Sequence, residues 1–267
     1  MGRIIVITSG KGGVGKTTAT ANIGTALAMM GNEVVLVDAD IGLRNLDIIM
    51  GLEGRVVYTS MDIVEGVCDL HKALVKGRVE NLRLLAASQR NSKNDFPIEY
   101  MKKICTELSE TYDYVLIDSP AGIEQGFQMS AEAADEAVII TTPEVTAIRD
   151  ADRIIGLVQS IGIDNLSLVV NRLSVEMIEN GNMMGPEDII EVLAIPLLGV
   201  VPEDKDIIIA TNKGAPLILS KNSKSGEAYK RIARRVNGED NIPIPDLKEA
   251  SWFPHLIKKI FRAGEGG

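Results

Sequence analysis

The stretch GKGGVGKTT at residues 10–18 constrains the fold more than any other part of this 267-residue chain. Gly10, Gly15, Lys16 and Thr17 fit the pattern G-x-x-x-x-G-K-[ST]. An apolar run precedes the pattern and a segment of helical periodicity follows it, which is the context that a phosphate-binding loop requires. The glycines let backbone N–H groups converge on phosphate oxygens at a helix N-terminus. The sequence therefore predicts a strand, a loop and a helix that together bind a nucleotide.

Seven short apolar runs, rich in Val, Ile and Leu, predict the strands of the fold. They alternate with helical segments, and aromatic residues make up only 4% of the chain. This alternation favours an α/β fold with a doubly wound, mostly parallel sheet. The predicted strands are RIIVIT from Arg3, EVVLVD from Glu33, LRLLAA from Leu82, YDYVLID from Tyr112, EAVIITT from Glu136, LSLVVN from Leu166 and LLGVV from Leu197. The predicted helices are residues 16–30, 98–111, 125–134, 146–161 and 224–236.

The composition limits the possible partners and compartment. The chain has 28 basic and 37 acidic residues, a net charge of −9, so its body is not expected to attract nucleic acid or anionic lipid. No apolar run approaches the roughly 18 residues that span a bilayer, and the N-terminal run is too short for a signal peptide, which indicates a cytoplasmic protein. Cys68 and Cys105 lie outside any metal-binding pattern, so we expect core or half-buried thiols.

The composition changes near the C-terminus, and this change divides the chain into three predicted parts. We expect a P-loop domain at 1–236, a linker at 237–250 and a tail at 251–267. The linker, NGEDNIPIPDLKEA, is acidic and contains two prolines.

The tail separates its apolar and basic side chains on a helical wheel. An interfacial membrane helix has this pattern, and a helix docked on its own core is the alternative. Pro254 disfavours helical geometry at Phe253 and delays the predicted helix start. The predicted membrane-contacting residues are Trp252, Phe253, Leu256, Ile257, Lys258, Lys259, Ile260, Phe261 and Arg262.

Carboxylates end two of the predicted strands. Asp38 and Asp40 come at the end of the second strand, and Asp118 ends the fourth. Ligands of open α/β sheets bind outside the carboxyl ends of strands, so all three are expected to face the loop. Asp118 fits an Mg²⁺ shell together with the Thr17 hydroxyl, and one of the other two carboxylates fits the role of positioning water. The alternative is that these residues only form turns or cap helices.

Lys11 adds a second lysine to the loop, which then resembles the deviant Walker A loop, KGGxGKT, of the MinD/ParA family of P-loop ATPases. Further runs are similar to the MinD branch of this family: DADIGLRNLDIIMG from Asp38, IDSPAGIE from Ile117, ADEAVIITTPE from Ala134, IRDADRIIG from Ile148, and GVVPED followed by ATNKGAPLIL. The resemblance covers roughly residues 1–219 and the tail.

The resemblance implies an ATPase that binds ATP with Mg²⁺ and forms a face-to-face homodimer around two nucleotides. Lys11 then reaches the ATP of the partner subunit while Lys16 serves its own, so Lys11 is expected to contact little in a single subunit. Asp40 becomes the residue that positions water, and Thr17 with Asp118 the Mg²⁺ shell.

The resemblance also implies the nucleotide contacts. Asn171 and Arg172 are expected on the adenine side, and the segment from Pro202 to Asp204 over the base. The complete expected set is Gly10, Lys11, Gly12, Gly13, Val14, Gly15, Lys16, Thr17, Thr18, Asn171, Arg172, Pro202 and Asp204.

The function implied by the resemblance is a spatial switch that places the division septum. Its ATP-bound form is expected at the inner face of the cell membrane, with a MinC-like inhibitor and a MinE-like activator as partners and slow turnover until stimulation. Asp150 and Asp152 belong near the dimer and partner surface, or are simply solvated. The alternatives are a ParA-like partition ATPase, which the net charge of −9 disfavours because such proteins bind DNA, and a relative that positions another assembly.

Overall fold

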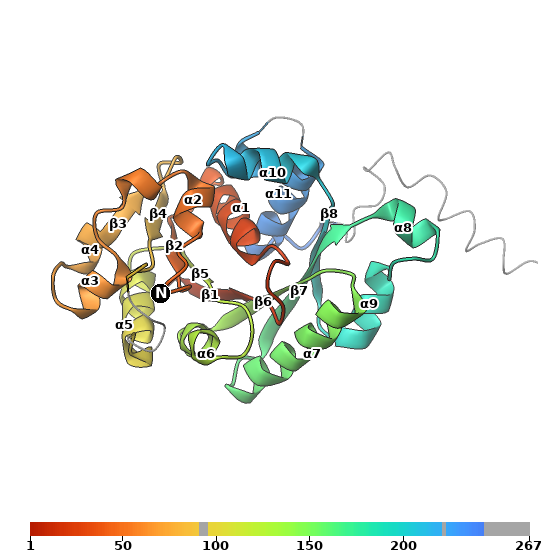
Figure 1. Cartoon of the computed structure of the whole chain (residues 1–267), viewed down its shortest axis with the longest axis horizontal. Coiled ribbons are helices and arrows are strands. Elements are labelled where there is room, and N and C mark those ends of the chain that lie inside the picture. Colours follow the sequence, from red (N-terminus) through yellow and green to blue (C-terminus); the bar gives the residue numbers. More distant parts are fainter. Residues whose placement is uncertain (91–95, 221–222, 243–267) are drawn as a thin grey trace, which may run out of the picture.

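The computed structural model describes residues 1–90, 96–220 and 223–242 of the chain. A single sheet of eight strands runs through it, with helices on both faces (Figure 1). The strands are β1 (Arg3–Thr8), β2 (Val34–Asp38), β3 (Leu74–Lys76), β4 (Leu82–Leu85), β5 (Tyr114–Asp118), β6 (Glu136–Thr141), β7 (Asn165–Leu173) and β8 (Leu197–Pro202).

The longer helices lie close to the predicted positions, and several short ones join them. They are α1 (Lys16–Met29), α2 (Leu46–Met50), α3 (Ser60–Val64), α4 (Leu70–Ala73), α5 (Ile98–Ser109), α6 (Gln125–Glu132), α7 (Val145–Ser160), α8 (Val175–Glu179), α9 (Pro186–Leu193), α10 (Lys205–Asn212) and α11 (Lys224–Val236). Two 3₁₀ turns are at Glu53–Arg55 and Leu217–Leu219.

The strand order is β3-β4-β2-β5-β1-β6-β7-β8, and every neighbouring pair is parallel except β3 with β4. The prediction of a doubly wound, mostly parallel sheet is therefore confirmed. The count of seven strands was wrong, because β3 is a three-residue antiparallel edge strand that directly follows α4. A strand this short has no periodicity of its own for a sequence pattern to reveal.

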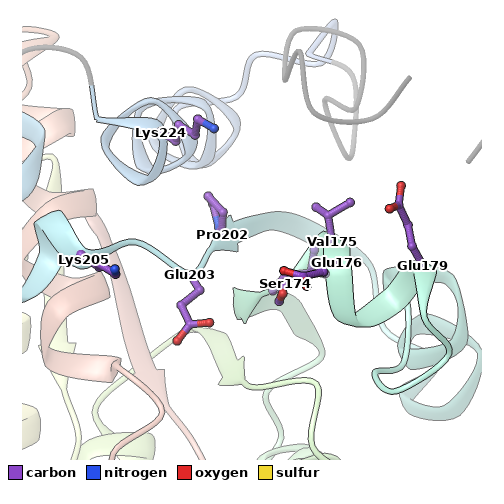
Figure 2. Close-up of a pocket in the computed structure, with 9 residues that line it drawn as sticks. Ser174, Val175, Glu176, Glu179, Pro202, Glu203, Lys205 and Lys224 are labelled. Carbon is purple, nitrogen blue, oxygen red and sulfur yellow. The ribbon is translucent and has the colours of Figure 1, made fainter. Parts of the chain in front are cut away.

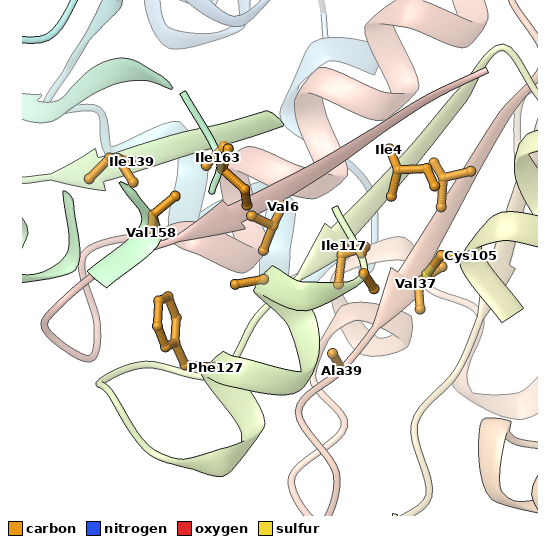
Figure 3. Packing of buried hydrophobic residues seen from close by; sticks show 14 of the residues in the cluster. Ile4, Val6, Val37, Ala39, Cys105, Ile117, Phe127, Ile139, Val158 and Ile163 are labelled. Atoms are coloured by element: carbon orange, nitrogen blue, oxygen red, sulfur yellow. The ribbon is translucent and has the colours of Figure 1, made fainter. Parts of the chain in front are cut away.

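Alternate residues of each central strand enter two separate hydrophobic cores. Along β1, Ile4 and Val6 point to one face, while Ile5 and Ile7 point to the other. The first core lies under α5, α6, α7 and α9, and Figure 3 shows Phe127 of α6 and Val158 of α7 on this side of the sheet. The second core lies under α1, α2 and α11. Burial on both faces explains why the strands read as continuous apolar runs.

The chain changes direction around β1, which lies between β5 and β6 near the middle of the sheet. From β1 it passes through α1 to β2 on one side, and from β5 through α6 to β6 on the other. A crevice forms outside the carboxyl ends of strands at such a point, and ligands bind there. The loop of residues 9–15 follows β1 and therefore occupies this crevice.

The predicted tail at 251–267 lies outside the described residues, as does most of the predicted linker. The described part of the linker, 237–242, follows α11 in turns. Among the residues that the structure describes, no helix is long and apolar enough to cross a membrane. Cys105 is buried, Cys68 is half-buried, and both are free thiols, as the sequence predicted.

Candidate nucleotide-binding site

The loop after β1 adopts a conformation that only glycines take easily. Gly13 and Gly15 have φ values of 78° and 99°, in the left-handed region that side chains rarely adopt. Gly15 is the N-cap residue of α1, and a Cβ atom on it would lie 2.4 Å from Nδ2 of Asn171. The side chain of Asn171 is buried and donates a hydrogen bond of 2.7 Å from Nδ2 to the carbonyl oxygen of Val14. Asn171, near the end of β7, thus holds the loop in place through this hydrogen bond.

A pocket of about 560 Å³ opens beside this loop at the carboxyl ends of the strands. The loop and the start of α1 form one wall, and the segment after β2 forms the other. The lining residues are Gly12, Gly13, Gly15, Lys16, Thr17, Thr18, Asp40, Leu43, Asn45, Ile48, Ile49, Ser119, Ala121, Arg172 and Thr211. Backbone N–H groups of a loop and a helix N-terminus at one wall form a binding surface for phosphate.

Lys16 lies in this pocket with only 8% of its surface exposed. Its charge is close to Asp118, which ends β5 and is 2% exposed. Burial raises the pKa of Asp118, while a hydrogen bond from Thr17, the charge of Lys16 and a hydrogen bond from Thr20 oppose this shift. The Thr20 hydroxyl donates to Oδ1 of Asp118 over 3.3 Å. The carboxylate therefore sits among the residue types that hold Mg²⁺ in P-loop proteins.

Asp38 is the second buried carboxyl group of the site, directly opposite Asp118 in the β2–β5 register. Burial, and then the nearby charge of Asp118, raise the pKa of Asp38 to about 8. Its two oxygens accept hydrogen bonds from the backbone N–H groups of Asp40 (3.0 Å) and Leu46 (3.2 Å). Asp38 therefore holds both ends of the loop that carries Asp40.

That loop has a strained residue and a buried ion pair. Arg44 has a φ of 50°, which is uncommon for a residue with a side chain. Its Nε donates to Oδ2 of Asp47 over 2.6 Å, and Asp47 is only 1% exposed. Asp40 lines the pocket from this loop, facing the P-loop. The sequence RNLD thus fixes the wall of the pocket that bears Asp40.

Lys11 has partners within its own subunit, so the expectation that it contacts little there was wrong. Its Nζ lies 2.8 Å from Oε2 of Glu144 and 3.4 Å from the Thr146 hydroxyl, both at the start of α7. Gly10 packs against the same helix, since a Cβ atom on it would lie 2.2 Å from the carbonyl oxygen of Asp150. Lys11 and Glu144 are 133 residues apart in the sequence, so no local sequence motif predicts their contact. Lys11 therefore faces α7 rather than the pocket.

The expected adenine contacts divide between two places. Arg172 lines the pocket and has a φ of 58°, and its N–H donates to the side chain of Asn171 over 2.9 Å. Pro202 lines a different hollow. Asp204 caps α10, accepting from the backbone N–H of Asp206 over 2.9 Å.

The carboxylate of Asp204 also joins two helices. It accepts hydrogen bonds from the Ser223 hydroxyl (3.0 Å) and the Ser225 N–H (3.2 Å) at the start of α11. Burial opposes ionisation of this group, but the hydrogen bonds outweigh it and lower its pKa. The contacts of Asn171, Pro202 and Asp204 with a base stay predictions. In this structure the side chains of Asn171 and Asp204 form hydrogen bonds between separate segments of the chain, and the carbonyl oxygen of Pro202 accepts one from the Ser225 hydroxyl.

Several pocket residues were not predicted from the sequence. Leu43, Asn45, Ile48 and Ile49 come from the segment after β2, and Thr211 comes from α10. The two segments touch where Gly51 meets Gly214: a Cβ atom on Gly51 would lie 2.2 Å from the Gly214 carbonyl oxygen. The sequence motifs did not reveal these residues, because α2 has only five residues and α10 comes after the segment that was predicted to cover the base.

The fold and the pocket define a P-loop nucleotide-binding protein whose loop carries the additional lysine of the deviant Walker A type. Comparison with known proteins agrees. The ParA family model, described as NUBPL iron-transfer P-loop NTPase, matches residues 1–237.

Individual relatives narrow the class. The chain is 53% identical to the septum site-determining protein MinD of Synechocystis over the full length of both chains. A solved MinC:MinD cell division protein complex from Aquifex aeolicus is 48% identical, with a TM-score of 0.85 over 91% of this chain and 98% of that one. MinD of Pyrococcus horikoshii, solved with Mg-ADP, is 32% identical, with a TM-score of 0.82 over 89% and 97%. The chain belongs to the MinD family.

Proposed function

We propose that the chain is an ATPase that helps to place the division septum by switching between a monomer and an ATP-bound homodimer. The observation that carries this proposal is the convergence of Lys16, Asp40 and Asp118 on one glycine loop. The names of the MinD relatives support the assignment to septum placement.

The residues present fit a magnesium nucleotide. Asp38 and Asp118 are 1% and 2% exposed, and their raised pKa values mean that the site stabilises two negative charges poorly by itself. Asp118 and Thr17 would hold a Mg²⁺ ion, which would balance that charge and supply electrostatic stabilisation to the phosphate oxygens of the nucleotide.

Each remaining side chain has a task that its position suits. Lys16 and the loop N–H groups hold the phosphates of the subunit's own ATP. Asp40 orients the attacking water from the opposite wall. Lys11 leaves Glu144 and contacts the phosphates of the partner's ATP when a second subunit docks, because only then does it meet a larger negative charge than one carboxylate.

Dimerisation then controls membrane residence. We propose that 1–236 is the ATPase domain, 237–250 a linker and 251–267 the membrane-binding tail. One short amphipathic tail binds a bilayer weakly, whereas two tails on one dimer gain roughly 10²–10⁴ in avidity. The ATP-bound dimer is therefore a peripheral membrane protein. It recruits a MinC-like inhibitor, which the MinC:MinD complex of Aquifex aeolicus supports, and a MinE-like protein stimulates its turnover.

The variant Asp40→Ala tests the proposed reaction. Without the carboxylate, water is not oriented, so we expect phosphate release to fall by about 10²–10⁴ while ATP binding and dimerisation persist. Asp69→Ala, at the exposed N-cap position before α4, is the matched control and should change none of these. Unchanged phosphate release in Asp40→Ala would remove Asp40 from the mechanism.

Deletion of residues 251–267 tests the membrane step. We expect ATP-dependent sedimentation with vesicles of phosphatidylglycerol and phosphatidylethanolamine to be lost, with nucleotide affinity unchanged. If the shortened chain still sediments with ATP, the tail is not the membrane anchor.

A further inference from the structure

A second hollow, of about 580 Å³, lies between α8, the end of β8 and the start of α11 (Figure 2). It shares no lining residue with the nucleotide pocket. Leu173, Val175 and Pro202 supply apolar surface to its lining. Of these three residues only Pro202 is predicted to contact the nucleotide, so the rest of the hollow needs a separate explanation.

The rim of this hollow carries three carboxylates. Glu176 and Glu179 project from α8, and Glu203 follows β8 (Figure 2). All three residues are exposed, and within the part of the chain that the structure describes none of these carboxylates forms an ion pair. Lys205 and Lys224 line the side nearer α10 and α11. The lining therefore carries three carboxylates and two lysines, a net charge of −1, with the carboxylates of α8 on the side away from the lysines. Apolar surface beside these carboxylates suits an occupant that is both apolar and basic.

The chain's own C-terminus starts within reach. Arg235 donates from Nη1 to the Leu198 carbonyl oxygen over 2.6 Å and from Nη2 to the Ile242 carbonyl oxygen over 3.5 Å. Ile242 therefore lies near the beginning of β8. The hollow lies at the other end of this strand, where the Ser225 hydroxyl donates to the Pro202 carbonyl oxygen over 3.0 Å.

The distances agree with the length of the linker. The six residues of β8 cover roughly 17 Å. Residues 243–250 span up to roughly 26 Å when extended, so residue 251 can be placed at the hollow without any change in the domain.

The tail also matches the hollow in chemistry. Its apolar side chains include Trp252, Leu256 and Ile260, and its basic ones are Lys258, Lys259 and Arg262. Three cations thus correspond to three carboxylates, and the apolar set corresponds to the lining of Leu173, Val175 and Pro202.

We propose that residues 251–267 dock in this hollow when the protein is a nucleotide-free monomer away from a membrane. The proposal rests on the proposed function, in which the same residues bind the bilayer. Docking competes with membrane binding, because one apolar face cannot serve both. The monomer therefore binds the membrane more weakly than a single free tail would, because docking adds to the loss of avidity.

Trp252 makes the test direct, because it is the single tryptophan of the chain. In the full-length protein without nucleotide or lipid, we expect blue-shifted emission and a severalfold smaller acrylamide quenching constant than in a synthetic peptide of residues 251–267. The double variant Glu176→Lys, Glu179→Lys should shift both values towards those of the peptide. It should also bind anionic vesicles severalfold better without ATP.

A matched control separates docking from general charge. Glu107→Lys with Glu132→Lys makes the same charge change on exposed residues of α5 and α6, and should leave Trp252 as in the parent protein. Circular dichroism of every variant checks the fold.

The outcomes also distinguish docking from the proposed function. Docking is overturned if Trp252 of the parent protein is as accessible as in the peptide, or if the control has the same effect as the double variant. If Trp252 is protected but no form binds vesicles even with ATP, the membrane step fails and docking stands. If Trp252 is accessible and ATP-dependent vesicle binding is normal, only docking fails.

Discussion

The two lysines of the phosphate-binding loop lie five positions apart and have opposite surroundings. Lys16 is 8% exposed, lies inside the pocket and interacts with the buried carboxylate of Asp118. The side chain of Lys11 is 41% exposed and pairs with Glu144, whose side chain is 57% exposed. An ion pair this exposed contributes little stability, typically below about 1 kcal/mol, so it can be exchanged for another partner. The buried lysine suits a permanent task and the exposed one a conditional task.

The largest effect is expected from Lys16→Ala, which tests the permanent task. Loss of a charged donor to phosphate should weaken nucleotide binding on the order of 100-fold. Titration with a fluorescent ATP analogue measures this, and Lys16→Arg is the matched variant that keeps the charge. An affinity within about twofold of the parent value would place the phosphates elsewhere.

A different loss is expected from Lys11→Ala. Nucleotide affinity of the monomer should persist, because Lys11 faces α7 and not the pocket. The ATP-dependent dimer should not form, and light scattering coupled to gel filtration measures its mass. If Lys11→Ala dimerises like the parent protein, the two lysines do not differ in the way proposed.

A smaller effect, of opposite sign, is expected from Glu144→Gln. Lys11 then gives up a weaker partner when subunits dock, so the concentration for half-maximal dimerisation with ATP should fall by up to about fivefold. Glu107→Gln, at an exposed position of α5, removes the same charge and is the matched control. Weaker dimerisation in Glu144→Gln would mean that Glu144 helps Lys11 in the dimer.

The smallest expected effect is a change in thermal stability with pH, which arises from Asp38 in the buried region around Lys16. Asp38 has a folded-state pKa raised to about 8, so the folded state holds its proton more tightly than the unfolded state. Below pH 4 both states are protonated; the resulting cost to stability grows as pH rises and is complete above about pH 8.

The nucleotide-free and magnesium-free protein should therefore lose Tm between pH 6 and pH 9. In Asp38→Asn this loss should be smaller by a few degrees, on the order of what 1 kcal/mol produces in a chain of this size. Parallel pH slopes in the two proteins would show that Asp38 is ionised without cost.

The sequence predicted the region around Lys16 better than the region around Lys11. Asp38, Asp118 and the glycines lie within motifs that a strand or a loop defines locally, so their positions followed from the fold class. The partner of Lys11 is distant in sequence, and a contact between a loop and a remote helix depends on packing. Thr211 was not predicted for the same reason, because its place in the pocket depends on how α10 packs. The structural role of Asn171 depends on its 2.7 Å hydrogen bond to the Val14 carbonyl oxygen, which a sequence motif does not predict.

Mixing two inactive variants tests the central claim, that Lys11 serves the ATP of the other subunit. Lys11→Ala lacks only the donated lysine, and Asp40→Ala lacks only the residue that orients water. In a mixed dimer, the Lys11→Ala subunit keeps its own Asp40 and receives Lys11 from its partner. We predict that an equimolar mixture regains phosphate release, up to about a quarter of the parent rate, because random pairing makes half of the subunit pairs mixed and each mixed pair has one complete site of its two. A mixture as inactive as its components would contradict the account.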